Sequence, residues 1–129
     1  MGDKSATCIL IVEDNEDSAE SLKMLLEALG YAAHVARDGE AALSAALALQ
    51  PEVILMDVGL PGMNGYEAAR RIRRQSVNRN MLIVALTGWG HQTDRRRSAE
   101  AGIDHHLVKP LDLEKLRQIL QSGPPRDRR

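Results

Sequence analysis

The chain has 129 residues, and its 17 basic and 18 acidic side chains leave a formal net charge of −1. At this length folding removes about two-thirds of the chain's surface from water, and the 43% apolar residues suffice for a core without disulfides or structural metals. This composition excludes a disordered or fibrous protein. Tyr31, Tyr66 and Trp89 are the only aromatic residues, which is too few for a stacking platform that would bind single-stranded nucleic acid.

Targeting and membrane segments are not visible in the sequence. The longest apolar stretch, 41–49, is far shorter than the roughly 20 residues that cross a bilayer. The first residues lack the basic region and apolar core of a secretory signal. The single Cys8 allows no intramolecular disulfide, and its apolar neighbours predict a small buried thiol. We therefore expect a cytoplasmic protein without a membrane span.

Apolar runs alternate with helical patterns along the chain. In chain order we predict strand 8–12, helix 18–29, strand 32–36, helix 39–49, strand 53–56, helix 66–74, strand 82–86, helix 93–101, strand 106–108 and helix 113–120. The first, third and fourth strands are continuously apolar, which is typical of parallel strands buried on both faces. Five strand–helix repeats predict an open, doubly wound parallel sheet with helices on both faces.

Apolar spacing and terminal residues support the helices. Four leucines follow the i, i+3, i+4 and i+7 spacing of one helix face: Leu22, Leu25, Leu26 and Leu29. Gly30 stands where a left-handed residue closes such a helix. The segment 93–101 is the weakest helix, because it offers only alanines for burial.

The sequence predicts one domain between two short terminal segments. We expect residues 1–6 to be an N-terminal extension, 7–121 to be one domain and 122–129 to be a flexible tail or linker stub.

Charged residues are unevenly distributed along the sequence. Residues 1–20 carry six acidic and one basic side chain, whereas 70–97 carry eight arginines and one aspartate. The arginines form either a solvated helix face or a surface that binds a partner or a phosphate group.

Polar side chains follow four of the predicted strands. Glu13 and Asp14 follow the first strand, Asp57 the third, Thr87 the fourth and Lys109 the fifth. Ligands bind beyond the carboxyl ends of the strands in doubly wound sheets, so we expect these side chains to converge. Carboxylates without Cys or His favour a hard ion such as Mg²⁺ over zinc. The ammonium and the hydroxyl suit phosphoryl oxygens, so the sequence predicts a phosphoryl site.

Four segments carry a family resemblance. They are 9–15 (Ile-Leu-Ile-Val-Glu-Asp-Asn), 55–65 (Leu-Met-Asp-Val-Gly-Leu-Pro-Gly-Met-Asn-Gly), 85–88 (Ala-Leu-Thr-Gly) and 107–110 (Leu-Val-Lys-Pro). In this order and spacing they resemble the receiver domain of two-component response regulators, over roughly residues 7–121. The resemblance implies a flavodoxin-like α/β fold of five βα units, with strand order 2-1-3-4-5. It also implies a cis peptide bond between Lys109 and Pro110.

The resemblance implies roles for the acidic residues. Asp57 would be the phosphoacceptor, taking a phosphoryl group from a phosphohistidine on a histidine kinase or a histidine phosphotransfer domain. Asp14 and Asp57 would coordinate Mg²⁺ or Mn²⁺ together with the main-chain carbonyl of Gly59. Glu13 would act mainly through a metal-bound water.

The resemblance also implies a switch. Thr87 would turn to bind the phosphoryl group, and Lys109 would pair with it. His106 stands where receivers usually place a Tyr or Phe that swings inward on activation, so it is either a switch residue with Thr87 or a partly exposed strand residue. Trp89 is unusually bulky, and we expect it to cover the phosphoryl group partly and slow its hydrolysis.

We expect a phosphorylation-controlled signalling domain rather than a turnover enzyme, monomeric or weakly dimeric, without direct nucleic-acid binding. It would be either a stand-alone regulator or a receiver excised from a hybrid histidine kinase. The segments 87–90 (Thr-Gly-Trp-Gly) and 104–110 (Asp-His-His-Leu-Val-Lys-Pro) resemble receivers of such kinases. In that case the domain would be part of a kinase chain.

Two alternatives from other classes remain. An aspartyl-phosphate phosphatase needs a second Asp two residues after the nucleophile, where this chain has Gly59. A flavin- or nucleotide-binding module needs a phosphate-cradling loop after the first strand, where the acidic segment 13–17 would repel phosphate.

Overall fold

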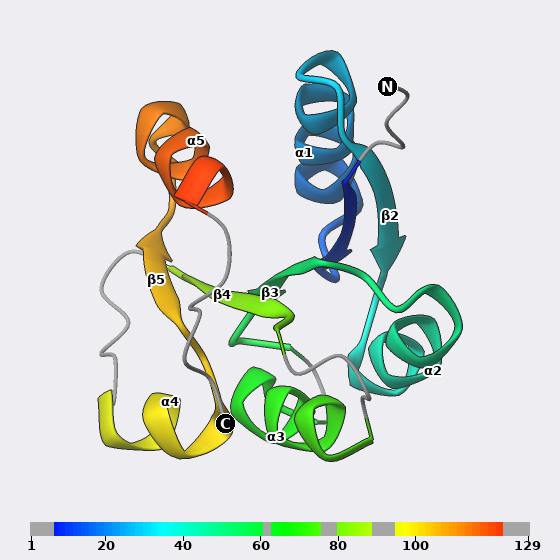
Figure 1. The fold of residues 1–129 in the computed structure, drawn as a ribbon, viewed down its shortest axis with the longest axis vertical. Helices are drawn as coiled ribbons and strands as arrows, with labels where there is room; N and C mark the ends of the chain where they lie inside the picture. The colour runs from blue at the N-terminus through cyan, green and yellow to red at the C-terminus, as the bar shows by residue number, and fades with distance from the viewer. Residues whose placement is uncertain (1–6, 61–62, 76–79, 89–94, 123–129) are drawn as a thin grey trace.

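The computed structural model describes residues 7–60, 63–75, 80–88 and 95–122, in which strands and helices alternate (Figure 1). The strands are β1 (Cys8–Val12), β2 (Ala32–Ala36), β3 (Val53–Asp57), β4 (Leu82–Thr87) and β5 (His105–Val108). The helices are α1 (Glu16–Ala28), α2 (Gly39–Leu49), α3 (Gly65–Gln75), α4 (Arg95–Ala101) and α5 (Leu113–Ser122). All strand pairs are parallel, and their order is β2-β1-β3-β4-β5, so β2 and β5 are the edges. The predicted doubly wound order is confirmed.

Most predicted boundaries agree with the structure to within two residues. Helix α1 begins earlier than predicted because the Asn15 side chain accepts a hydrogen bond from the backbone N–H of Ser18 (2.9 Å) and caps the helix. Gly30 has a φ of 98°, so the predicted left-handed residue after this helix is confirmed. The predicted start of α4, Thr93, lies outside the described residues. The bond between Lys109 and Pro110 is cis, as the resemblance implied.

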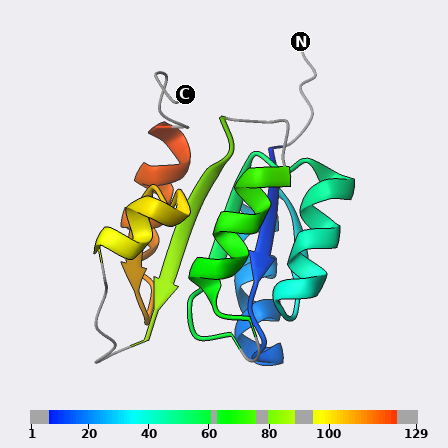
Figure 2. The same cartoon turned by 90° about the horizontal axis from the view of Figure 1, so that it is seen from below.

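The helices cover both faces of the sheet. Figures 1 and 2 show α1 and α5 on one face and α2, α3 and α4 on the other. Successive strand residues point to opposite faces, so Ile9 and Ile11 of β1 pack beneath α1 while Leu10 and Val12 pack beneath α2. This burial on both faces explains why the central strands are continuously apolar.

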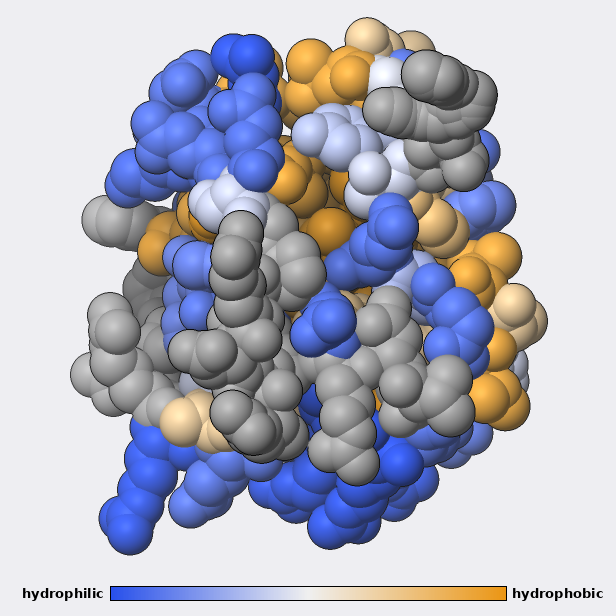
Figure 3. Space-filling model, viewed as in Figure 1, coloured by the Kyte–Doolittle hydropathy of each residue, from blue (hydrophilic) through white to orange (hydrophobic). Residues whose placement is uncertain are grey.

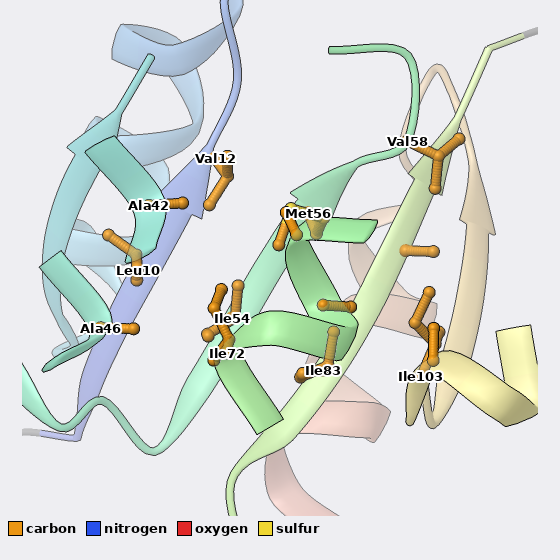
Figure 4. Close-up of a cluster of buried hydrophobic side chains, with 14 of the residues drawn as sticks. Leu10, Val12, Ala42, Ala46, Ile54, Met56, Val58, Ile72, Ile83 and Ile103 are labelled. Carbon is orange, nitrogen blue, oxygen red and sulfur yellow. The ribbon is translucent and has the colours of Figure 1, made fainter. Parts of the chain in front are cut away.

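Aliphatic side chains and alanines fill the larger of the two cores, shown in Figure 4. The residues labelled there are Leu10, Val12, Ala42, Ala46, Ile54, Met56, Val58, Ile72, Ile83 and Ile103. Ala42 and Ala46 are buried on α2, where their small size lets the helix lie close to β1. Ile72 of α3 is fully buried, and burying such a side chain contributes about 1.5–3 kcal/mol. This packing holds the strands, and hence their carboxyl ends, in fixed register.

Arg73 of α3 forms a clamp on the segments that precede β4 and β5. Its guanidinium donates hydrogen bonds to the carbonyl of Gly102 (3.0 and 2.8 Å) and to that of Met81 (2.5 Å). It also pairs with the Asp104 carboxylate (2.9 Å), which accepts a further hydrogen bond from the backbone N–H of Ile83 (2.9 Å). One side chain therefore ties α3 to the starts of two strands.

Cys8 differs from the prediction of a buried thiol, because it is only partly buried. It is the first residue of β1, and its backbone N–H lies 3.3 Å from the Glu52 carboxylate. Burial, and then the negative charge of Glu52, raise the pKa of the Cys8 thiol. The thiol is therefore held in its protonated, less reactive form.

Within the described ranges, none of the helices is long and apolar enough to cross a membrane.

Replacing Arg73 tests the clamp. Arg73→Ala removes four hydrogen bonds, one of which is also a mostly buried ion pair, so the free energy of unfolding should fall by about 3–5 kcal/mol in urea titrations. Arg74→Ala, the same change at the exposed neighbouring position, should cost less than about 0.5 kcal/mol. Similar losses in both variants would contradict the clamp.

Candidate functional site

The carboxyl ends of the parallel strands meet at one edge of the sheet, toward which the strand arrows in Figure 2 point. Five of the predicted site residues stand there: Glu13, Asp14, Asp57, Thr87 and Lys109. Backbone hydrogen bonds continue the ladders past the strands, from Glu13 N–H to Ala36 O (3.0 Å) and from Lys109 N–H to Thr87 O (2.8 Å). The functional side chains are therefore positioned by sheet backbone.

Three carboxylates form an acidic cluster at this edge. Glu13, Asp14 and Asp57 each offer an oxygen, and these oxygens lie within 4.8 Å of one another. Glu13 and Asp57 are buried, whereas Asp14 is exposed. Charges this close repel one another, and an all-oxygen donor set is the kind that Mg²⁺ prefers. The residues present therefore fit the predicted ion.

Lys109 connects two members of the cluster. Its Nζ lies 2.6 Å from Glu13 Oε1 and 3.3 Å from Asp57 Oδ2. Burial alone would lower the pKa of Lys109, but the hydrogen bond to Glu13 and the charges of Asp57 and Glu13 outweigh burial and raise it. The ammonium therefore stays charged beside the carboxylates.

The remaining oxygens of Asp57 and Glu13 accept hydrogen bonds from backbone N–H groups. Asp57 Oδ1 accepts one from Gly59 (2.9 Å), and Glu13 Oε2 accepts one from Asn15 (3.1 Å). Both oxygens of Glu13 thus have protein donors. The loop after β3 folds back on the carboxylate that precedes it, which fixes the Asp57 side chain.

Gly65, the first residue of α3, packs directly against the end of β3. A Cβ atom at this position would lie 2.6 Å from Val58 Cα and 2.8 Å from the Asp57 carbonyl oxygen. Asn64 caps the helix by accepting a hydrogen bond from the backbone N–H of Glu67 (3.0 Å). Only glycine lets α3 begin this close to the strand that carries Asp57. Pro61 and Gly62, in the same connection, lie outside the described residues.

Thr87 and His106 lie on neighbouring strands beyond the acidic cluster. Thr87 is buried, and its hydroxyl lies 3.5 Å from the Leu107 carbonyl, at the limit of a hydrogen bond. His106 is half-buried, and its Nε2 shares a hydrogen bond of 2.6 Å with the hydroxyl of Ser98 on α4. The imidazole thus connects β5 to α4. Trp89, which we expected near the phosphoryl group, lies outside the described residues.

Ser98 is a residue that sequence reasoning missed. The prediction that α4 would bury only alanines is wrong, because Ser98 is as fully buried as Ala101. The two residues are three positions apart and so share one helix face, which was the available signal. A buried hydroxyl needs a partner, and His106 supplies it.

A cavity of about 430 Å³ opens beside the acidic cluster, between α1 and the segment after β5. Its apolar lining includes Leu22, Leu25 and Leu111, and its polar lining includes Glu13 and Lys109. The cavity therefore joins an apolar groove along α1 to the charged site.

Comparison with known proteins identifies the family. The chain matches the family model described as the response regulator receiver domain over residues 9–121. It belongs to this family. Receiver domains are the phosphoacceptor domains of two-component signalling, and their partners are histidine kinases or phosphotransfer domains. The predicted family and the flavodoxin-like fold are confirmed.

Relatives and one solved structure agree with this assignment. The master transcriptional regulator RpaA of Synechocystis is 32% identical over 108 residues, which are 84% of this chain but 45% of RpaA. The polar-differentiation response regulator DivK of Brucella anthropi is 30% identical over 114 residues, 88% of this chain and 93% of DivK. The receiver domain of sensor histidine kinase PA1611 from Pseudomonas aeruginosa is 37% identical with a TM-score of 0.82, covering 92% of this chain and 97% of that domain. That structure holds a magnesium ion in its active-site cleft.

Alanine substitutions at two glycines test how α3 is seated. Gly65→Ala should lower the free energy of unfolding by about 1–3 kcal/mol, because the new methyl group would overlap backbone atoms. Gly59→Ala is the matched control, since a Cβ there would make an ordinary contact of 3.5 Å with Asp57 Oδ1. Chemical denaturation of both variants checks this, and equal losses would contradict the close approach at Gly65.

The raised pKa of Lys109 predicts a pH dependence of stability. Because the pKa of Lys109 is higher in the folded state, its ammonium contributes fully to the free energy of unfolding below its unfolded pKa of about 10.4. This contribution is lost as the pH rises through the folded pKa. The difference in unfolding free energy between wild type and Lys109→Met should therefore stay constant from about pH 7 to pH 9 and shrink only above about pH 10.4.

Urea titrations across this range measure that difference. Lys115→Met, which removes an exposed charge on α5, should change stability by less than about 0.5 kcal/mol at pH 7. A Lys109→Met difference that already shrinks between about pH 7 and pH 9 would contradict the raised pKa.

Proposed function

We propose that Asp57 is the residue of this receiver domain that accepts the phosphoryl group. The observation that carries the proposal is the position of its carboxylate, at the end of β3, within 4.8 Å of two other carboxylates and 3.3 Å from the Lys109 ammonium. Asp57 is buried, and as the last residue of β3 it lies at the carboxyl ends of the strands, where doubly wound folds bind ligands.

The reaction is a phosphoryl transfer from phosphohistidine to a carboxylate. An oxygen of Asp57 bonds to phosphorus, the phosphorus–nitrogen bond breaks, and its electron pair remains on the imidazole of the donor, which then takes up a proton. The transition state is loose, so negative charge spreads over the equatorial phosphoryl oxygens. Lys109 lies beside Asp57 Oδ2, where its ammonium meets these oxygens.

Mg²⁺ or Mn²⁺ would be held by Asp14 and Asp57 with the main-chain carbonyl of Gly59. The ion would supply positive charge that offsets the repulsion between the carboxylates and the incoming phosphoryl group. Glu13 would act through a water, and the protein donors that already occupy both of its oxygens support this indirect role. Asp14 is exposed, so its carboxylate can be reached from solvent.

Thr87 and His106 would form the switch. The bond from the Thr87 hydroxyl to the Leu107 carbonyl is long, so turning toward a phosphoryl oxygen costs Thr87 little. That turn would change the space next to His106, whose imidazole is bound to Ser98 on α4. Phosphorylation would replace the single negative charge of the Asp57 carboxylate by the about −1.5 to −2 charges of a phosphoryl group, which extends further from the strand, and would thereby bias the position of α4.

The donor would approach along α1. The cavity of about 430 Å³ offers apolar leucines next to Lys109 and Glu13, which suits an amphipathic helix that carries a phosphohistidine. The similarity to the PA1611 receiver supports a receiver of a hybrid histidine kinase, and the similarity to DivK supports a stand-alone regulator. In either case we place the domain in the cytoplasm, without direct nucleic-acid binding.

Incubation with acetyl phosphate and Mg²⁺ tests the proposal. Mass spectrometry should find one phosphoryl group on the wild type and none on Asp57→Asn. Asp17→Asn, which removes an exposed carboxylate of α1, should accept the group as the wild type does. A chelator should slow the reaction by at least about tenfold, because the carboxylates then repel the phosphoryl donor without compensation.

Other outcomes would support the two alternatives. Steady release of many phosphate ions per protein would indicate an aspartyl-phosphate phosphatase. Absence of a phosphoryl adduct, together with a bound flavin or nucleotide, would indicate a cofactor-binding module. An adduct that persists in Asp57→Asn would show that another residue is the acceptor.

A further inference from the structure

Exposed and half-buried arginines gather on α3 and α4. The arginine face consists of Arg70, Arg71, Arg74, Arg96 and Arg97. Half of the Arg71 side chain and 89% of the Arg96 side chain are exposed. Figure 3 shows strongly hydrophilic side chains along the lower margin, where Figure 1 places these two helices.

Two glutamates pair with arginines of this face. Glu67 pairs with Arg70 (3.3 Å) and Arg71 (2.8 Å), and Glu100 lies 3.9 Å from Arg96. The five arginines and these two glutamates together carry a formal charge of +3. Arg97 also stacks over the Tyr66 ring at 4.5 Å, which places its guanidinium at the surface between the two helices.

Exposed acids gather on α1. The acidic face consists of Glu16, Asp17, Glu20 and Glu27. Lys23, half-buried, is the one basic residue within Glu16–Ala28, so this face carries an excess of three negative charges. The charge excess of the acidic face therefore equals that of the arginine face and has the opposite sign.

The two faces lie on opposite sides of the sheet. Figures 1 and 2 place α1 on one side and α3 with α4 on the other, so the faces cannot meet within one molecule. Helices of 13 and 11 residues are about 20 and 16 Å long, so α1 and α3 present surfaces of similar length. A near-neutral protein with opposite poles attracts its own copies when salt is low.

We propose that copies of this chain associate head to tail, with the acidic face of one copy against the arginine face of the next. Each guanidinium can accept a carboxylate in a bidentate, charge-assisted pair. Because the two faces are different surfaces, the contact is heterologous and does not close into a two-fold dimer. Exposed ion pairs are individually weak, so the association is reversible and sensitive to salt.

The association would also affect phosphoryl transfer. Asp17 of the acidic face lines the cavity beside the acidic cluster, so a copy seated on α1 would obstruct the approach of a phosphoryl donor. This consequence rests on the proposed function, whereas the self-association does not.

Sedimentation velocity of the whole chain tests the proposal at about 0.01 M and about 0.15 M salt, where the screening length falls from about 30 to about 8 Å. The average mass of the wild type should rise with protein concentration at low salt, and the association should weaken at least about tenfold at the higher salt. Arg71→Glu with Arg96→Glu should be monomeric at both salt concentrations. Glu20→Arg with Glu27→Arg should also be monomeric alone, and a mixture of these two variants should associate again.

A control variant carries the same change in net charge as the arginine-face variant. Lys115→Glu with Arg117→Glu alters two exposed side chains of α5, outside both faces, by the same charge as the arginine-face variant. It should associate as the wild type does. The circular dichroism of each variant verifies that it is folded, and because either face can be reversed, one unfolded variant leaves the test intact.

Several results would overturn the proposal. They are a wild type that stays monomeric at low salt, an arginine-face variant that associates as well as the control, and a closed dimer that survives the higher salt. A monomeric wild type that binds duplex DNA through the arginine face would instead assign this surface to nucleic acid.

Discussion

Repulsion among three carboxylates at one edge of the sheet is the constraint on which the site depends. Glu13, Asp14 and Asp57 come from two strands, and parallel pairing brings them together regardless of their charge. Lys109, from a third strand, reaches two of them and offsets part of the repulsion. The cluster is therefore compatible with a folded protein, and it retains an excess of negative charge. This excess is what a divalent ion would balance.

The rest of the fold holds this edge in place from α3. Gly65 allows the helix to start against the strand that carries Asp57, and Arg73 binds the starts of β4 and β5 at the other end of the same helix. One helix thus connects the site to the far end of the sheet. Helix α4 is connected to β5 by the hydrogen bond between Ser98 and His106. The proposed switch would act on α4 through this hydrogen bond.

The sequence was sufficient to predict the elements and the meeting of Glu13, Asp14, Asp57 and Lys109, because both follow from local patterns. Buried parallel strands are continuous apolar runs, and in a doubly wound sheet the residue after each run faces the ligand. The clamp was not predictable, since Arg73 stands among other arginines and its partner Asp104 is 31 residues away. Cys8 was predicted to be buried from its apolar neighbours, but a residue at the first position of a strand is covered on fewer sides.

Among the described residues no strand pairs with the outer side of β2 or β5, and both strands are short, with five and four residues. Unpaired edges can recruit strands from other molecules and so begin amyloid-like aggregation. Short edge strands offer few consecutive backbone N–H and C=O groups to a strand of another molecule. The short lengths of these two strands therefore limit aggregation of the folded chain through its sheet edges.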